Sequence, residues 1–486
     1  MPGGGGRTLG AGERGGRGNR AGLTVRRPRR RGGDSGYGAR TVIIGAGDAG
    51  RAVARALRGG EGRLTPVGFV DDDPPADTVC GLPVLGGTAD IAGAAWPVGA
   101  QVAVVAVPSL PAAQIAQLVG RALAAGLDVR YVSPSTPREA QPRRLLDRDE
   151  LTVVSARARR LVTGRRVLVT GACGTIGAPL SRQIGALAPA ALIRLDNDAG
   201  TLRRLAGEGA TGRAAVVDIR DGPRVDELFD ELRPELVFHT AGYNNDPRPL
   251  ERRPSAAVLT NVLGTRNLVR ASVRGKAERF VLVSTDQAAD PVSVLGATRR
   301  LSELVLQAEA GGSTCFAAVR AGSVLGSGAS PLAMVAGQVA AGQTIIVAHP
   351  DLTRHLMTAR EAGELVLEAA AMAEEAETLA LDTGEPSSVL ELVGGFVDGL
   401  CLPEVTIRFT GLGPGERLRA KSFSDFETKL RTAHPKICAT RATPLPPGRS
   451  ELLAALLAAA GRGADDDVRV LIRRILPEYR PHEGLR

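Results

Sequence analysis

The chain has 486 residues, of which 43% are hydrophobic and 23% charged, a composition typical of a globular protein with about three domains. Its formal net charge is +9, but residues 1–40 hold ten arginines against two acidic side chains. The rest of the chain is therefore nearly neutral, and a body that binds nucleic acid is not expected.

The cysteine spacing and the hydropathy argue against two further classes, metal-binding proteins and membrane-spanning proteins. The five cysteines have neither metal-ligand nor CxxC spacing, which predicts reduced thiols and no metal site. No apolar run approaches the roughly 18 residues of a membrane span, and no signal peptide is visible. We therefore expect a cytoplasmic protein.

Residues 1–38 are rich in glycine and arginine and almost free of apolar side chains, so the sequence predicts a disordered tail. Contact with RNA or anionic lipid through Arg26–Arg31 is one interpretation. A solvated extension without function, or a wrongly chosen start codon, is the favoured one.

Residues 39–133 alternate between strand and helix patterns, which predicts a first Rossmann-like domain with a parallel sheet. Strand 41–44 runs into the glycine motif 45–50, and strand 66–70 ends in three aspartates. The glycine fingerprint is complete but the domain is short, so nucleotide binding and a regulatory or scaffolding role both stay open. Residues 134–165 are interpreted as a linker with a short helix.

A second, stronger nucleotide motif occupies residues 166–177. Strand 166–169 runs into a turn that Gly171 permits, and a helix is expected from about Ile176. Gly174 lets a pyrophosphate approach the backbone, and Gly177 lets the helix pack on the strand. The free N–H groups at the helix N-terminus then attract the phosphates.

The next strands, 191–195, 214–217 and 236–238, each end in polar or small residues. Asp196 stands about 20 residues past the last glycine, where a carboxylate binds ribose hydroxyls, and Asp218 ends the following strand. This pattern predicts a dinucleotide site. Repulsion of a 2′-phosphate by Asp196 favours NAD over NADP, although Arg194 and Arg203 keep NADP open.

The second domain continues to residue 425. We expect a helix over 251–272, a strand over 280–283 that ends in Ser284-Thr285-Asp286, a helix over 297–310 and a strand over 317–320. From Gly328 the pattern loosens into short elements, interpreted as a substrate lobe, and residues 426–486 are expected to form a helical extension. The prediction is an α/β protein with two doubly wound, Rossmann-like parallel-sheet domains in tandem.

The collinear motifs of the chain are GAGDAG, GFVDDD, VLVTGACGTIG, VVDIRD, TNVLGT, VLVSTDQAADPVSVLGATRRLSELV, HPDLTRHLMT, LDTGEP and FTGLGPGE. In these motifs the chain resembles the polysaccharide-biosynthesis (CapD-like) nucleotide-sugar 4,6-dehydratase/epimerase family of extended short-chain dehydrogenase/reductases. The resemblance covers roughly residues 41–420. It implies a CoA-binding-like first domain, a bound NAD or NADP, a UDP-sugar substrate and a homo-oligomer. Many members carry four membrane helices ahead of the first domain, and we expect none here.

The resemblance also implies roles for individual residues. The cofactor-binding positions are Gly171, Cys173, Gly174, Thr175, Ile176, Gly177, Asp196, Asp218, Ile219, Ala241, Gly242, Tyr243, Asn261 and Arg299. The catalytic positions are Thr285, Asp286, Gln287, Leu295 and Arg299. The substrate-binding positions are Ser323, Arg354 and Glu416.

The departures from the family fall on the acid–base positions. Gln287 stands where relatives have a lysine, and an amide cannot abstract the C5 proton of the sugar. Leu295 replaces a tyrosine or methionine, and Arg299 replaces the lysine that holds the nicotinamide ribose. On the substrate side, Ser323 replaces an asparagine and Gly413 an arginine that binds the diphosphate.

Three interpretations remain. In the first, the protein is a nucleotide-sugar enzyme with altered chemistry, in which Thr285 and Asp286 polarise the sugar and Tyr243 or Ser293 is recruited. The family normally oxidises C4, eliminates water across C5–C6 and returns the hydride; here we expect 4-epimerisation rather than dehydration. In the second, it binds NAD(P) and a sugar nucleotide without turnover, as a partner or sensor. In the third, it has an unrelated activity such as RNA contact.

Overall fold

A computed structural model describes residues 38–59, 64–132, 143–144, 154–206, 212–243, 247–309, 311–327, 330–399, 406–441 and 449–481. The tail expected to be disordered lies, except for Gly38, outside these ranges, so that expectation stays a prediction.

The first sheet has five strands in the order β2-β1-β5-β6-β7. Its first four strands are parallel, and β7 pairs antiparallel with β6. The bounds are β1 Ala39–Ile44, β2 Leu64–Val70, β5 Val102–Val105, β6 Asp128–Tyr131 and β7 Arg143–Arg144. A separate hairpin pairs β3 Thr78–Val79 with β4 Leu82–Pro83. The helices of this region are α1 Asp48–Gly59, α2 Ile91–Ala95 and α3 Ala112–Ala124, with the short 3₁₀ turn η1 at Thr88–Asp90.

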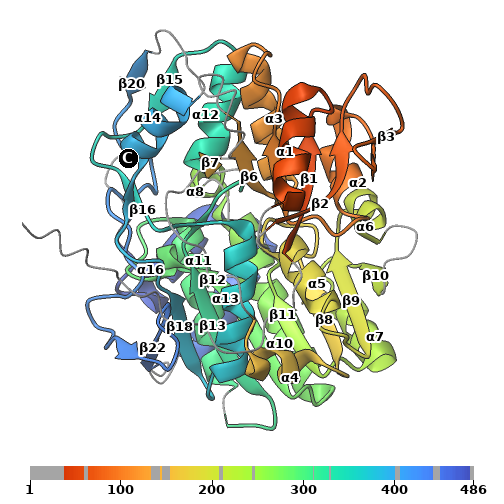
Figure 1. Ribbon diagram of the computed structural model, residues 1–486. Helices are drawn as coiled ribbons and strands as arrows, with labels where there is room; N and C mark the ends of the chain where they lie inside the picture. Colours follow the sequence, from red (N-terminus) through yellow and green to blue (C-terminus); the bar gives the residue numbers. More distant parts are fainter. Residues whose placement is uncertain are drawn as a thin grey trace, which may run out of the picture. The chain divides into compact units, whose positions relative to one another are not determined.

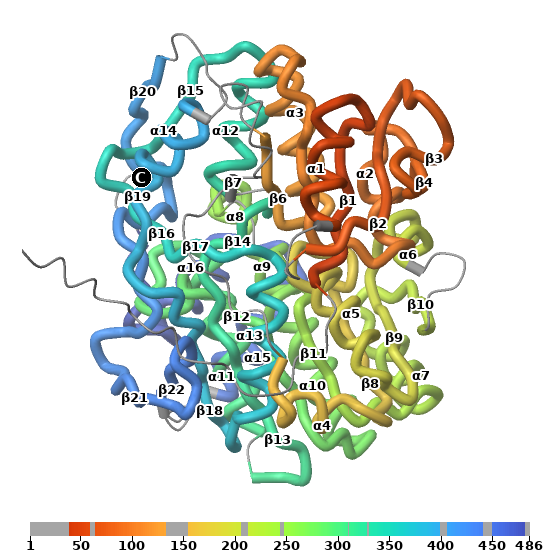
Figure 2. Tube along the Cα trace, viewed as in Figure 1, coloured from red at the N-terminus to blue at the C-terminus, as the bar shows by residue number. Residues whose placement is uncertain are grey.

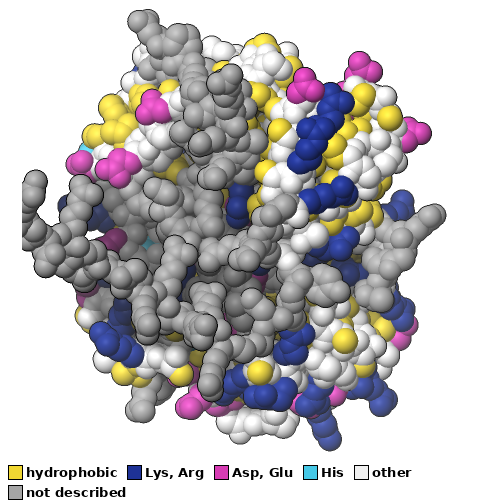
Figure 3. All heavy atoms as spheres, in the orientation of Figure 1, with side chains coloured by type: hydrophobic (Ala, Val, Ile, Leu, Met, Phe, Trp, Pro, Cys, Tyr) yellow, Lys and Arg dark blue, Asp and Glu magenta, His cyan; other side chains and the backbone are white. Residues whose placement is uncertain are grey.

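Helix α1 comes directly after the glycine motif of this sheet and is strongly two-sided. Val53 and Ala54 are buried against the strands. Arg51, Arg55 and Arg58 recur at helical spacing, and basic side chains gather over α1 in Figure 3. The apolar stripe therefore fixes α1 on the sheet and leaves a basic face outward.

The second sheet has nine strands in the order β10-β9-β8-β11-β12-β13-β18-β22-β21. The strands from β10 to β18 are parallel, and β22 and β21 join antiparallel. The strand order reverses between β8 and β11, which is where doubly wound sheets bind ligands. The bounds are β8 Arg166–Thr170, β9 Ala191–Asp196, β10 Arg213–Val216, β11 Leu236–His239, β12 Arg279–Thr285, β13 Cys315–Ala321, β18 Glu377–Leu381, β21 Leu430–Arg431 and β22 Ile437–Arg441.

Helices cover both faces of this sheet because its strands are apolar on both sides. Along β12, Phe280 and Leu282 enter one core, whereas Val281 and Val283 enter the other. Figure 1 shows α13 in front of the strands. One face carries α7 Gly222–Leu232, α10 Gly264–Arg274, α11 Val294–Ala308, α15 Arg449–Gly461 and α16 Asp465–Ile475. The other carries α4 Ala156–Val162, α5 Gly177–Gly185, α6 Ala199–Ala206 and α13 Ala359–Met372.

The helix expected over 251–272 is broken into shorter pieces. The segment contains α8 Arg248–Arg252, α9 Pro254–Ala257, a π-helical turn at Val258–Leu263 and then α10. The carbonyl of Asn261 accepts hydrogen bonds from the hydroxyls of Thr265 at 2.5 Å and Ser302 at 2.8 Å. The two hydroxyls thus satisfy a carbonyl group of the widened turn, and Asn261 lies inside the protein. Such π-helical turns are frequent at functional sites.

The region after Gly328 contains more regular structure than expected. It holds α12 Pro331–Ala340, α13, β18 and α14 Val389–Gly399. Residues 426–486, expected to be helical, also supply β21 and β22 to the main sheet. The remaining short strands pair as β14 Ser323–Val324 with β17 Leu356–Met357, β15 Ile345–Val347 with β20 Ile407–Phe409, and β16 Thr353–Arg354 with β19 Ser387–Ser388. Among the described residues, no helix is long and apolar enough to cross a membrane.

Helix α3 of the first sheet lies beside α12, as Figure 2 shows. Leu118 and Leu123 of α3 share one hydrophobic core with Leu332 and Val335 of α12. At Gly326 a Cβ atom would lie 2.3 Å from the Leu123 carbonyl oxygen, so only glycine allows this approach. The first sheet is thus packed against the lobe that comes after β13.

Candidate functional site

The glycine loop after β8 forms a close-packed cradle. Gly171 has φ +66°, and a Cβ atom there would lie 2.6 Å from the backbone nitrogen of Ala241. A Cβ atom at Gly177 would lie 2.0 Å from the Gly171 carbonyl oxygen. Helix α5 begins at Gly177, and no side chain caps it at Ile176. Its first N–H groups are therefore available to an anion.

Asp196 at the end of β9 is oriented toward this loop. Its carboxylate accepts a hydrogen bond from the Cys173 backbone N–H at 2.9 Å and another from that of Asp198 at 3.1 Å. Burial, assisted by Asp196, raises the pKa of the Cys173 thiol well above its ordinary value. Cys173 is therefore an inert thiol, and its backbone N–H provides its polar contact with the site.

Asp218 lies after β10 at the same edge of the sheet. Arg220 donates Nε hydrogen bonds to both carboxylate oxygens, at 3.0 and 2.9 Å, and thereby lowers the pKa of Asp218. Ile219 is buried and packs against Gly264 of α10. Asp218 thus lies beside Asp196 but is already engaged by an arginine.

Arg299 of α11 is buried beneath the end of β11. Its Nε donates to the Tyr243 carbonyl oxygen at 3.2 Å, and the Tyr243 N–H donates to the Asn261 side chain at 2.8 Å. Arg299 is 1% exposed, and its Nη1 has no hydrogen-bond partner within the described ranges. Burial lowers the pKa of Arg299 to about 10. An unsatisfied buried cation beside Gly242 is a strong site for a polar ligand atom.

One cavity of about 340 Å³ brings the glycine loop and many of the other predicted residues together. It is lined by the following predicted positions: Gly174, Thr175, Ile176, Gly177, Gly242, Thr285, Asp286, Gln287, Ser323, Arg354 and Glu416. The predicted positions that do not line it are Gly171, Cys173, Asp196, Asp218, Ile219, Ala241, Tyr243, Asn261, Leu295 and Arg299. The cavity therefore connects the cofactor end of the site to the substrate end.

Asp286 is the buried acidic group of this cavity. It comes directly after β12, is 7% exposed, and accepts a hydrogen bond from the Thr285 hydroxyl at 3.2 Å. Burial raises the pKa of Asp286, while the charges of His355, Arg354 and Arg417 oppose that rise. Burial thus makes the carboxyl group easier to protonate than a solvent-exposed aspartate.

Two of the positions at which the chain departs from its relatives hold neutral side chains, as the sequence shows. Gln287 lines the cavity with a neutral amide. Leu295 is fully buried in an apolar cluster with Leu250 and Ala257, away from the cavity. Lys421 lines the cavity, but its ion pairs with Asp290 at 2.5 Å and Asp425 at 2.6 Å raise its pKa despite burial. A lysine held in its charged form cannot accept a proton.

Of the two candidates for a recruited role, one lines the cavity. Tyr243 is 44% exposed and is not among the lining residues. Ser293 lines the cavity, and its hydroxyl accepts the Gly296 N–H at 2.9 Å as the N-cap of α11. Ser293 is therefore already used as a helix cap.

Basic residues that the motifs did not identify dominate the substrate end. Arg248, Arg417, Arg419 and Lys421 line the cavity together with Arg354. The opposing acidic side chains of the lining are Asp286 and Glu416, and Glu416 accepts the Gly413 N–H at 2.8 Å. The sequence did contain a signal for three of them. Basic residues alternate at 417, 419 and 421, and alternation in an extended segment places side chains on one face. Arg248 gave none.

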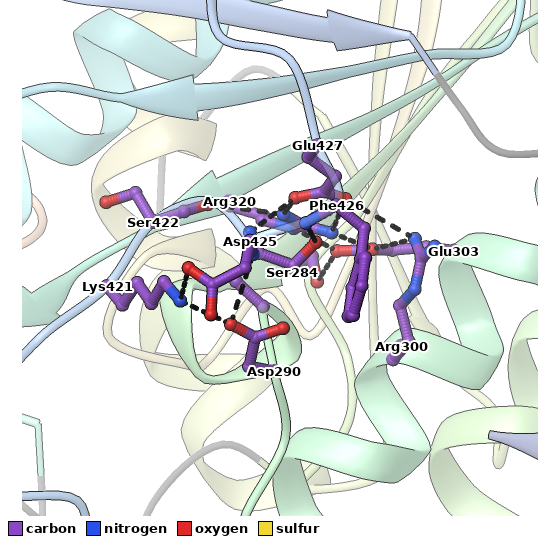
Figure 4. A network of polar contacts seen from close by, with 12 residues as sticks. Ser284, Asp290, Arg300, Glu303, Arg320, Lys421, Ser422, Asp425, Phe426 and Glu427 are labelled. Atoms are coloured by element: carbon purple, nitrogen blue, oxygen red, sulfur yellow. Dashed lines mark hydrogen bonds and ion pairs between the residues drawn. The ribbon is translucent and has the colours of Figure 1, made fainter. Parts of the chain in front are cut away.

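A buried ionic network fastens the segment that supplies these basic residues (Figure 4). Arg320 of β13 lies between Glu303 of α11 and Glu427, with N–O distances of 2.7 and 2.6 Å. Ser284 donates to Glu303 at 2.7 Å, and Arg320 also donates to the Ser422 carbonyl oxygen at 3.2 Å. The cavity wall at 415–421 is thereby tied to the central strands.

Within the described ranges no group of three or more His, Cys, Asp or Glu side chains is placed to hold a metal ion. His239, fully buried, exchanges hydrogen bonds with Thr170 at 2.8 Å and Thr265 at 2.9 Å. Burial lowers the pKa of His239 to about 3. It is a neutral structural histidine.

The sheet order, its switch point and the glycine cradle define an extended short-chain dehydrogenase/reductase fold with a dinucleotide-type loop. Residues 167–442 match the family described as polysaccharide biosynthesis protein. The chain belongs to this family, as the sequence motifs predicted. The match supports the predicted general class, an epimerase/dehydratase-like protein of polysaccharide biosynthesis.

Two relatives and one solved structure illustrate the likeness. The probable polysaccharide biosynthesis protein EpsC of Bacillus subtilis is 32% identical over 422 residues, covering 82% of this chain and 70% of EpsC. The capsular polysaccharide biosynthesis protein CapD of Staphylococcus aureus is 29% identical over 428 residues, with the same coverage of 82% and 70%. The X-ray structure of Pen from Bacillus thuringiensis has a TM-score of 0.54 and 25% identity, covering 58% of this chain and 90% of Pen.

Proposed function

We propose that the protein binds NAD(H) at the glycine loop 171–177 and a UDP-sugar in the adjoining cavity, and inverts the configuration of the sugar at C4. The observation that carries this proposal is the cavity itself. Its lining combines residues of the glycine loop, the residues Thr285 to Gln287 after β12, and five basic side chains. A cofactor and a sugar nucleotide would thus meet at the strand ends.

The residues present fit a dinucleotide. Side chains at Gly171 and Gly177 would collide with backbone, so these glycines permit the tight turn and the close packing of α5, and Gly174 would let a pyrophosphate approach the loop. A ribose hydroxyl would satisfy the unpartnered Nη1 of Arg299. When bound, NAD accepts a hydride from a sugar carbon and returns it. The carboxylate of Asp196 beside Cys173 disfavours a 2′-phosphate, and we therefore propose NAD rather than NADP.

The charge of the substrate end fits a diphosphate. The lining holds five basic side chains against the two carboxyl groups of Asp286 and Glu416. Arg354 is held by hydrogen bonds to the carbonyl oxygens of Thr353 and Arg417, both at 2.8 Å. A preorganised guanidinium binds phosphate without a further loss of side-chain freedom.

The side chains favour 4-epimerisation over 4,6-dehydration. Removal of hydrogen from C4 requires a group that takes the hydroxyl proton, and Asp286 beside Thr285 provides it. Dehydration requires in addition a base for the C5 proton. The amide of Gln287 and the charged Lys421 do not supply that base.

A second candidate function is binding without turnover. The observation in its favour is Leu295, whose side chain is buried in an apolar cluster where relatives have a tyrosine or methionine. In that case the cavity would retain NAD and a UDP-sugar as a sensor or partner. The expected homo-oligomer and the cytoplasmic location stay predictions under both functions.

The test is incubation of the purified protein with UDP-N-acetylglucosamine and UDP-glucose in heavy water. Epimerisation gives an isomer of unchanged mass without solvent deuterium on carbon. Dehydration gives a product lighter by one water, with solvent deuterium at a carbon. The first result supports the proposal and the second contradicts it. If neither sugar changes while NAD(H) and a UDP-sugar are released on denaturation, the binding function replaces the enzyme.

A further inference from the structure

The register of the second sheet shows which residues lie near Asp286 at the strand ends. Strands β12, β13 and β18 are adjacent and parallel, with Thr285 level with Ala321 and Arg320 level with Ala380. Asp286 and Gly322 each follow the first pair by one residue, and Gly322 and Asp382 each follow the second pair by two, so the three residues lie just beyond neighbouring strand ends. Since neighbouring strands lie about 4.8 Å apart, the two carboxyl groups flank a glycine that has no side chain of its own.

His355 occupies the space above Gly322. A Cβ atom on Gly322 would lie 2.9 Å from the Cβ of His355, and the His355 carbonyl oxygen accepts the Ser323 N–H at 2.7 Å. Nδ1 of His355 is buried and has no hydrogen-bond partner in the part of the chain that the structure describes. An imidazole with an unpartnered, buried Nδ1 therefore stands over the end of β13, near enough to Asp286 and Asp382 for its charge to act on both.

The electrostatics of both carboxyl groups agree with this placement. The charge of His355 comes first among those that oppose the burial-driven rise in the pKa of Asp286, ahead of Arg354 and Arg417. His355 also acts on Asp382, whose pKa is lowered, against burial, mainly by a hydrogen bond from Lys429 at 2.9 Å. Lys429 is exposed. The series Asp286, His355, Asp382, Lys429 thus runs from the cavity to the surface.

We propose that His355 exchanges a proton with Asp286 during turnover and that Asp382 stabilises the resulting imidazolium. The proton on the Asp286 carboxyl group passes to an imidazole nitrogen: one O–H bond breaks, one N–H bond forms, and Asp286 becomes a carboxylate that can accept a proton from the sugar. The reverse transfer restores both groups. This inference rests on the proposed function, because it provides Asp286 in the carboxylate form when the sugar hydroxyl gives up its proton. His355 acts through Asp286 and is a positioning residue.

The kinetic test compares His355→Gln with His349→Gln in the full chain. His349 lies in the same segment, but its half-exposed side chain faces Asp351 at 3.9 Å, so it is the matched control. His355→Gln should lower kcat about 100-fold, the lower end of what a positioned proton carrier contributes, and leave KM within about twofold. Loss of a positive charge further raises the pKa of Asp286, so the limb of the kcat–pH profile that depends on Asp286 should move to higher pH. Unchanged kcat and profile, or equal effects in the control, would overturn the proposal.

A second, spectroscopic test does not require the protein to turn over a substrate. The chain has five histidines, and the imidazole resonance of His355 is assigned by its disappearance in His355→Gln. In Asp286→Asn the chemical shift of this resonance should change, because a neighbouring carboxyl group has been replaced by an amide, whereas the His349 resonance should not move. An unmoved His355 resonance overturns the proposal. Absence of NAD and UDP binding to the unsubstituted chain would overturn the proposed function instead.

Discussion

The two sheets carry nearly the same glycine cradle. At Gly50 a Cβ atom would lie 1.9 Å from the Gly45 carbonyl oxygen, and at Gly177 it would lie 2.0 Å from that of Gly171. In the first sheet the Ala46 N–H donates to Asp71 at 2.6 Å, as the Cys173 N–H donates to Asp196 at 2.9 Å in the second. The backbone requirement for a nucleotide loop is therefore met twice.

The difference lies in the residues at the neighbouring strand ends. Beside Gly45, β5 continues into Ala106 and Val107, and a Cβ atom on Gly45 would lie 2.5 Å from Cγ1 of Val107. Beside the second cradle lie Thr285 and Asp286 and the basic segment 417–421. The comparison teaches that a glycine cradle indicates a fold, whereas the polar residues at the neighbouring strand ends indicate a function.

The largest expected effect separates the two cradles. Gly174→Val should abolish NAD retention, with at least about 100-fold weaker binding, because a side chain there occupies the path of the pyrophosphate. Gly47→Val is the matched control three residues before Gly50, and nothing lies within 4 Å of its added Cβ atom. Calorimetric titration with NAD measures both. Loss of binding in the Gly47 variant alone would place the cofactor in the first sheet instead.

The second expectation contrasts a buried with an exposed ion pair. Glu303→Gln leaves the fully buried Arg320 with Glu427 as its remaining acidic partner, and should lower the free energy of unfolding by about 3 kcal/mol. Asp48→Asn at the first cradle breaks an ion pair with Arg51 in which the Asp48 side chain is 99% exposed. It should change that free energy by less than about 1 kcal/mol. Urea unfolding measures both, and equal effects would refute the contrast.

The third prediction concerns how the free energy of unfolding depends on pH. His239 has a pKa of about 3 in the folded chain against an ordinary value of 6.5, so the folded state favours the neutral ring. Its contribution to stability is complete above pH 6.5 and is lost as the pH falls toward 3, by about 1.4 kcal/mol per pH unit. His239→Gln should remove this slope from the unfolding free energy between about pH 6 and pH 4. The register places the apolar Val105 at the corresponding point of the first sheet, where Val105→Ala should leave the slope intact.

The smallest expected effect tests the fastening of the basic wall. Glu427→Gln weakens the bond to Arg320 that holds the segment before it, so UDP affinity should fall about tenfold, or about 1.4 kcal/mol. NAD affinity should be unchanged, because Glu427 lies outside the glycine cradle. Equal losses for UDP and NAD would mean that the variant disturbs the whole fold rather than the wall.

The sequence predicted the elements whose signal is local. The strands ending at Asp196 and Thr285 are short, mainly apolar segments, and Gly171 marks the turn after β8 because glycine permits it. Helix α13 was missed because it is buried almost all round and shows no clear apolar stripe. Strand β22 was missed because its partner β18 is distant in the chain.

The residues of the site can be divided in the same way, into those that a local sequence motif indicates and those that depend on tertiary structure. Gly174, Thr285 and Asp286 stand in motifs, and the structure brings them to one cavity. Arg299 stands at a motif position, but its buried, unpartnered nitrogen follows from tertiary packing and could not be read from the sequence. The place of His355 above Gly322 depends on the register of a sheet, which no single segment determines.

The central claim, that the second cradle alone holds the dinucleotide, is tested most directly by the stoichiometry of NAD binding to the full chain, measured by calorimetry after bound nucleotide has been removed. We expect one NAD per chain, retained in Gly47→Val and lost in Gly174→Val. Two NAD per chain, or one that survives Gly174→Val and disappears in Gly47→Val, would contradict it.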